Sequence, residues 1–115
     1  MSREQSVLDE ITRVPGVRSA VLVAADDGIV IAESAIDGQD TGAAAALSAH
    51  LLQRLTTVTG AIGHPPLTLV LLQATEGQVF AAKGGDGLVL VAVTGNDVNI
   101  GQVRLALLDA AGRLA

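Results

Sequence analysis

The sequence predicts an α+β domain in which a five-stranded antiparallel sheet carries helices on both faces. Short turns rich in Asp and Gly separate apolar, β-branched runs, so successive strands should be antiparallel. The runs "AVLVA", "LVLL" and "LVLVAV" are nearly apolar on both faces, and such a sheet needs cover on both sides. Three segments with helical spacing can supply that cover. We therefore expect one domain over residues 1–115, with the order α-β-β-α-β-β-β-α.

Local signals place each element in turn. The predicted elements are a helix at 2–13, strands at 17–25 and 29–34, a helix at 40–59, strands at 67–74, 78–83 and 88–93, and a helix after Asn99. Ser2 and Gln5 have the spacing of a capping box, and Asn99 stands in the same relation to Gln102. Gly28, after two aspartates, can adopt the positive φ that a tight hairpin turn requires.

The middle helix, with Asp40 or Thr41 as its N-cap, has more apolar surface than one sheet face can cover. At about 100° per residue its apolar arc spans roughly 200°, whereas an ordinary surface helix needs little more than about 100°. One stripe, expected to pack on the sheet, contains Ala44, Leu47, Leu51, Leu55 and Val58. The second contains Ala45, Ala49, Leu52 and Thr56. We expect this second stripe to meet the same helix of a second copy across a twofold axis.

The strand at 67–74 has few charges to protect it if it lies at the sheet edge, and such an edge invites pairing with another chain. Its predicted interface residues are Leu67, Leu69, Leu71 and Gln73. Helix and strand are consecutive in the chain, so one interface could bury both. The alternative is that the alanines are simply good helix formers exposed to water.

Composition narrows the classes of partner. Half of the residues are hydrophobic but only 17% are charged, against a usual figure of about 25%, which favours a subunit interface. The net charge is −5, and the seven Lys and Arg residues are dispersed, so nucleic acid and anionic membranes are not expected partners. The polar N-terminus and the absence of a long apolar run favour the cytoplasm.

The chain offers no recognisable catalytic or metal-binding pattern. His50 and His64 lack the spacing of a metal site, and Asp26 and Asp27 fall in a hairpin turn, where Asp is common. "KGGDG" at 83–87 precedes a strand rather than a helix and is better interpreted as a turn than as a phosphate loop. We expect no cofactor, no metal and no enzymatic activity.

A polar wedge on the middle helix is the candidate surface for a protein partner. It consists of His50, Gln53, Arg54 and Thr57. Apart from the candidate N-cap Asp40, Arg54 is the only Lys, Arg, Asp or Glu in this helix, and it could contact an acidic or phosphate group. The alternative is that Arg54 is simply solvated.

Three segments together resemble the Roadblock/dynein light chain family, including its MglB-type prokaryotic members. They are "VPGVRSAVLVAADDGIVIAES" at 14–34, "GGDGLVLVAV" at 84–93 and "NIGQVRLALLDAAGRL" at 99–114. The resemblance implies a non-catalytic homodimer in which the middle helices pack side by side and the third strands join two sheets. It also implies binding or regulation of a small Ras-like GTPase, or scaffolding of a signalling or polarity complex.

Two alternatives remain open at this point. A small-molecule sensor of the profilin-like or PAS-like type shares the five-stranded antiparallel sheet, but it would need a hollow lined by polar or aromatic groups, and Phe80 is the only aromatic residue. A small enzyme would need a nucleophile or an acid–base pair that the sequence does not display.

Overall fold

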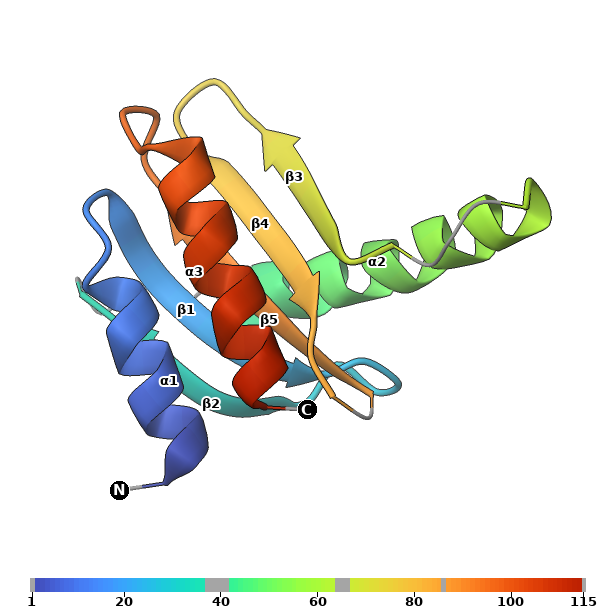
Figure 1. Cartoon of the computed structure of the whole chain (residues 1–115), viewed down its shortest axis with the longest axis horizontal. Helices are drawn as coiled ribbons and strands as arrows, with labels where there is room; N and C mark the ends of the chain where they lie inside the picture. Colours follow the sequence, from blue (N-terminus) through green and yellow to red (C-terminus); the bar gives the residue numbers. More distant parts are fainter. Residues whose placement is uncertain (1, 37–41, 64–66, 86, 115) are drawn as a thin grey trace.

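The structure is a computed structural model that describes residues 2–36, 42–63, 67–85 and 87–114. Its elements are α1 (Arg3–Thr12), β1 (Val17–Ala24), β2 (Val30–Ala35), α2 (Gly42–Ala61), β3 (Leu69–Gln73), β4 (Gln78–Lys83), β5 (Leu88–Thr94) and α3 (Ile100–Arg113). This order confirms the predicted one (Figure 1). The proposed N-caps Asp40 and Thr41, and also His64, lie outside the described residues.

The five strands form one antiparallel sheet in the order β2-β1-β5-β4-β3. The first and last strands, β1 and β5, pair at its centre, and hairpins add the remaining strands outward. The predicted antiparallel sheet is therefore confirmed. β3 lies at one edge, as the interface hypothesis requires, and pairs with β4.

Helices cover both faces of the sheet, as predicted. Figure 1 shows α1 and α3 side by side on one face and α2 crossing the other. Alternate strand residues supply the two cores. Leu22, Phe80 and Leu90 pack with α1 and α3, whereas Val21 and Val91 pack with α2.

The prediction of which α2 stripe packs on the sheet is wrong. Ala45, Ala49 and Leu52 are at most 1% exposed and pack on the valine-rich sheet face, whereas Leu47 is 73% and Val58 55% exposed. Both stripes are apolar, so their periodicity could not choose between them. The physical reason is side-chain size, because small alanines let the helix backbone approach the sheet more closely than a row of leucines would.

The two turns at one end of the sheet have the predicted conformations. Gly28 has φ +72°, and the Asp27 carboxylate accepts a hydrogen bond from the Ile29 N–H at 3.2 Å. In the second turn, the Gly84 N–H donates to the Leu88 carbonyl at 2.8 Å. The "KGGDG" segment is therefore a hairpin turn that leads into a strand.

Both predicted helix caps at the described termini are present. The Ser2 hydroxyl accepts from the Gln5 N–H at 3.1 Å, and the Asn99 side chain accepts from the Gln102 N–H at 3.0 Å. The Gln5 side chain donates to the Asp9 carboxylate and to the backbone carbonyl of residue 33. One of these hydrogen bonds lies within α1, and the other links α1 to β2.

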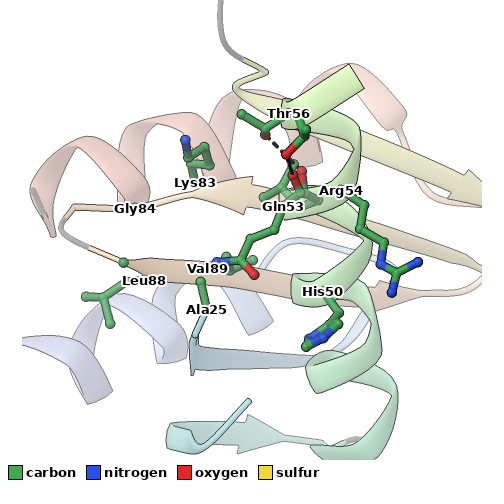
Figure 2. Close-up of a pocket in the computed structure, with 12 residues that line it drawn as sticks. Ala25, His50, Gln53, Arg54, Thr56, Lys83, Gly84, Leu88 and Val89 are labelled. Atoms are coloured by element: carbon green, nitrogen blue, oxygen red, sulfur yellow. Dashed lines mark hydrogen bonds between the residues drawn. The ribbon is translucent and has the colours of Figure 1, made fainter. Parts of the chain in front are cut away.

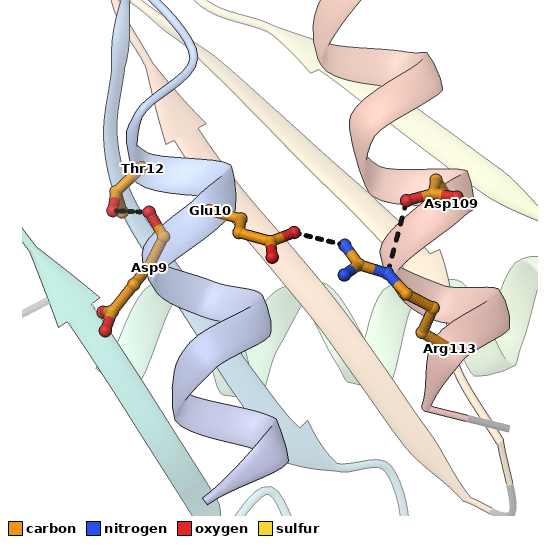
Figure 3. A network of polar contacts seen from close by, with 5 residues as sticks. All are labelled: Asp9, Glu10, Thr12, Asp109 and Arg113. Carbon is orange, nitrogen blue, oxygen red and sulfur yellow. Dashed lines mark hydrogen bonds and ion pairs between the residues drawn. The ribbon is translucent and has the colours of Figure 1, made fainter. Parts of the chain in front are cut away.

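An ion pair joins α1 to α3 on the outer surface (Figure 3). The Arg113 guanidinium donates to the Glu10 carboxylate at 2.6 Å, and it lies 3.3 Å from the Asp109 carboxylate. The hydrogen bond from Arg113 holds the pKa of Glu10 below its usual value. Because both side chains are largely solvated, the pair aligns two helices that the core already holds.

Candidate protein–protein interface

One flank of α2 presents an apolar stripe to solvent. We name it the outer stripe and define it as Leu47, Leu51, Leu55, Val58 and Ile62, the last lying just beyond the helix end. The spacing places all five within an arc of roughly 80°. Ile62 is 64% exposed, while Leu51 and Leu55 are half-buried. Each large aliphatic side chain left in water forgoes about 1.5–3 kcal/mol of burial, so the stripe is costly unless something covers it.

The outer stripe continues toward the open edge of the sheet. Figure 1 shows that the C-terminal half of α2 projects beyond the sheet on the side where β3 forms the edge. The β3 sequence, LVLLQ, contains no charge, Pro or Gly. Charges and prolines are devices by which proteins protect exposed edge strands from pairing. The projecting half of α2 and the unprotected edge strand β3 therefore form one candidate surface.

The opposite flank of α2 borders a groove of about 600 Å³ (Figure 2). Its walls are formed by the polar wedge and Thr56 on the helix side and by Lys83, Gly84, Gly87 and Leu88 on the sheet side. Ala25, Leu52 and Val89 form its floor, and all three are at most 5% exposed. The groove therefore combines an apolar bottom with a polar rim.

The side chains at the groove point in different directions. In Figure 2, Gln53 extends between helix and sheet toward Ala25 and Val89, whereas Arg54 points outward, away from Lys83. The Gln53 amide donates to the Asp26 carboxylate at 3.3 Å, which links α2 to the first hairpin turn. His50 lies on the same outward side of the helix as Arg54.

Two hydroxyl groups at the groove donate within their own helix. The Thr56 hydroxyl donates to the Leu52 carbonyl at 2.8 Å, and the Thr57 hydroxyl donates to the Gln53 carbonyl at 3.2 Å. Their oxygens can still accept hydrogen bonds from a ligand. The arrangement is suited to binding, because it offers an apolar floor, hydroxyl acceptors and cations at the rim.

The predicted wedge residues and the predicted dimer-interface residues differ in how far they are exposed. The wedge residues His50, Gln53, Arg54 and Thr57 are all exposed, and all line the groove. In the interface set, Ala45, Ala49 and Leu52 are buried in the protomer's own core, and Thr56 is half-buried. Leu67, Leu69 and Leu71 are half-buried along the edge, and Gln73 is exposed.

Sequence reasoning missed the position of Lys83 opposite the wedge. Lys83 is the last residue of β4 and pairs with Val89 of β5, which places it next to the groove floor. Only the pairing register brings this strand end against α2, and no local motif encodes that register. The outer stripe was also missed as a surface, because Leu47, Leu51, Leu55 and Val58 were assigned to the sheet-facing side and Ile62 lies beyond the predicted helix.

Within residues 2–36, 42–63, 67–85 and 87–114, no helix is both long and apolar enough to cross a membrane. In the same ranges, no three His, Cys, Asp or Glu side chains gather where they could hold a metal ion.

Comparisons with known proteins agree with the fold. A structure described as MglB with a tetrameric arrangement superposes with a TM-score of 0.87 at 24% identity, over 98% of this chain and 85% of that one. The gliding protein MglB of Thermus thermophilus gives 0.86 at 23% identity, over 98% and 86%. Profilin IB of Acanthamoeba castellanii gives 0.61 at 20% identity, over 93% and 92%, so the sheet is also profilin-like.

Among curated proteins, no sequence relative matches this chain. The sequence model of the Roadblock/LC7 domain, however, matches residues 4–94, which include every strand, α2 and nearly all of α1. This match covers most of the chain and agrees with the resemblance seen in its segments. The chain belongs to the Roadblock/LC7 domain family.

Proposed function

We propose that this chain is a non-catalytic, homodimeric Roadblock-type module that binds a small Ras-like GTPase. The observation that carries the proposal is the outer stripe, where Leu47, Val58 and Ile62 are each more than half exposed beside an unprotected sheet edge. A solvated monomer gains nothing from this arrangement, whereas a second copy covers the stripe and the edge together.

A twofold axis accounts for both surfaces at once. Two α2 helices pack through their outer stripes, and the β3 edges of the two copies pair, so that each copy presents the same patch to the other. Leu67, Leu69, Leu71 and Gln73 stay the proposed strand residues of the interface, and they join it through the β3 backbone edge, because Leu69 and Leu71 pack toward the core under α1 and α3. On the helix, the outer stripe takes the place of Ala45, Ala49 and Leu52, which the protomer itself covers.

The GTPase proposal rests on the similarity to MglB proteins and on the position of the polar wedge. Gln53 and Thr57 face the groove flank of α2, while the outer stripe lies on the opposite flank. Covering the outer stripe with a second copy therefore leaves Gln53 and Thr57 accessible, whereas Arg54, one turn before Val58, lies beside the covered stripe. A dimer presents two such wedges, and His50, with Arg54 at the border of the dimer contact, can reach acidic groups of a partner.

A titration with a purified Ras-like GTPase tests this function. The GTPase encoded nearest to this chain's gene is loaded with GDP or a non-hydrolysable GTP analogue and titrated by calorimetry. We expect binding that differs between the two nucleotides and that weakens at least about tenfold when His50 and Arg54 are both changed to Ala. Arg104→Ala, on the far side of the sheet, is the matched control. Equal binding by all three proteins would remove the wedge from the account.

The groove also keeps the small-molecule sensor as a second candidate. Its volume of about 600 Å³ falls in the range typical of ligand pockets, and its floor is apolar. Phe80 is the only aromatic residue and is buried in the other core, which counts against this candidate. A metabolite that raises the melting temperature and is blocked by Gln53→Leu would favour the sensor over the GTPase-binding module.

A further inference from the structure

The groove between α2 and the β4–β5 turn has an apolar floor that a charged ligand alone would not use. Ala25, Leu52 and Val89 form this floor, and their burial shows that it is continuous with the core under α2. Since these floor residues are themselves at most 5% exposed, the gain on binding comes from burying an apolar side chain that the occupant places on the floor. At about 600 Å³, the groove has room for more than one side chain.

Lys83 brings a cation to the edge of that floor. The β4–β5 register pairs Lys83 with Val89, so the lysine stands next to a floor residue. Among the described residues, Lys83 forms no ion pair and no side-chain hydrogen bond. Its ammonium group is therefore available to a carboxylate that enters beside an apolar anchor.

Among the residues that the structure describes, the charged side chains lining the groove are cations, opposite in sign to the net charge of the chain. The net charge is −5, yet Arg54 and Lys83, two of only seven Lys and Arg residues, line the groove together with His50. None of the described residues that line it is acidic. Asp26 lies at the margin, where it accepts a hydrogen bond from Gln53. A partner segment that carries carboxylates is complementary to this lining.

We propose that the groove binds an acidic, apolar segment of the protein partner. This proposal rests on the proposed function, because it specifies how that partner is recognised. An apolar side chain of the segment sits on Ala25, Leu52 and Val89, and a neighbouring carboxylate pairs with Lys83. The outward-pointing Arg54 and His50 contact further acidic groups where the segment leaves the groove.

Short peptides test the groove without a GTPase. The probe is a fluorescein-labelled peptide of alternating Leu and Asp, and its control replaces each Asp by Asn. We expect the Asp peptide to shift the backbone amide NMR signals of Ala25, Gly84 and Gly87, to bind less tightly as salt rises, and to bind at least about fivefold more tightly than the Asn peptide. Equal binding of the two peptides, or shifts confined to other regions, would overturn the proposal.

Variants assign the binding to the groove. Lys83→Gln changes an exposed side chain and should leave the melting temperature unchanged while it weakens the Asp peptide about fivefold to tenfold. Arg104→Gln, which removes an exposed cation from α3, should have no effect on the peptide. If Lys83→Gln binds the Asp peptide as the unmodified chain does, Lys83 is not the recognition group and the proposal fails.

Two further experiments test whether the groove binds small anions alone and whether peptide binding needs the dimer. Inorganic phosphate and acetate, added alone, should not reproduce the shifts at Ala25, Gly84 and Gly87. If they do, the groove is a small-anion site and the acidic-segment proposal is wrong. The Ile62→Asp variant, designed to be monomeric, should still bind the Asp peptide. Peptide binding there would support the groove even if the dimer or GTPase proposal failed, and its loss would contradict the proposal.

Discussion

A matched pair of substitutions in α2 tests which side of the helix faces the sheet. Leu52→Ala and Leu47→Ala remove the same atoms from one helix, but Leu52 is 1% and Leu47 73% exposed. Leu52 packs against the valines of the sheet, so its truncation leaves a cavity and should cost about 3–5 kcal/mol. That is a fifth or more of the stability of a typical small domain, about 5–15 kcal/mol. Leu47→Ala should cost the protomer less than about 0.5 kcal/mol.

Urea unfolding followed by circular dichroism measures both variants. The experiment is run at several protein concentrations, because unfolding of a dimer depends on concentration and Leu47 also contributes to the proposed dimer. At the lowest concentration, Leu52→Ala should unfold at a much lower urea concentration than the unmodified chain, and Leu47→Ala close to it. Equal losses there, or a harmless Leu52→Ala, would refute the inference that the alanine-containing stripe faces the sheet.

Three further predictions concern single contacts. Glu10→Gln should destabilise the chain at neutral pH, because only the carboxylate pairs with Arg113. The difference in stability between the two chains should disappear as pH falls through the lowered pKa of Glu10. Unfolding measured between pH 2 and 7 checks this, and a difference that does not change with pH would contradict it. Gly77→Ala should cost about 1–3 kcal/mol, since its Cβ would lie 2.6 Å from the Thr94 carbonyl oxygen. Gly112→Ala, at an exposed position of α3 with open space around its Cβ, should stabilise the chain by about 0.5–1 kcal/mol. Thermal melts that reversed this order would contradict both predictions. Asn99→Ala should cost about 0.5–2 kcal/mol by removing the α3 cap, and Asn99→Ser should recover most of it; the test fails if both variants melt alike.

The parts of the fold that local chemistry determines could be predicted from the sequence. Turn residues such as Gly28 separate the strands, and side chains such as Ser2 and Asn99 begin helices, so every element was placed within two residues of its observed ends. The double cover of the sheet followed from strands that are apolar on both faces.

Packing decided what local chemistry could not. Both stripes of α2 are apolar, and the choice between Ala49 and Leu47 as the buried residue depends on how closely the helix approaches the sheet. The groove depends on the β4–β5 register, which sets Lys83 beside Val89 and opposite α2. Side-chain periodicity reports neither the distance of α2 from the sheet nor the β4–β5 register. The wedge could therefore be proposed from the sequence, whereas the groove that it borders could not.

The solution mass of the unmodified chain tests the central claim most directly. Light scattering coupled to size exclusion is performed from low micromolar to high micromolar concentration. The account predicts a species of at least twice the 11.6 kDa of one chain, and a shift to single chains when Val58 and Ile62 are both changed to Asp. The same double change at Ile100 and Leu105, two exposed apolar residues of α3, should leave the mass unchanged. An unmodified chain that stays at 11.6 kDa throughout would mean that water, and not a second copy, covers the outer stripe.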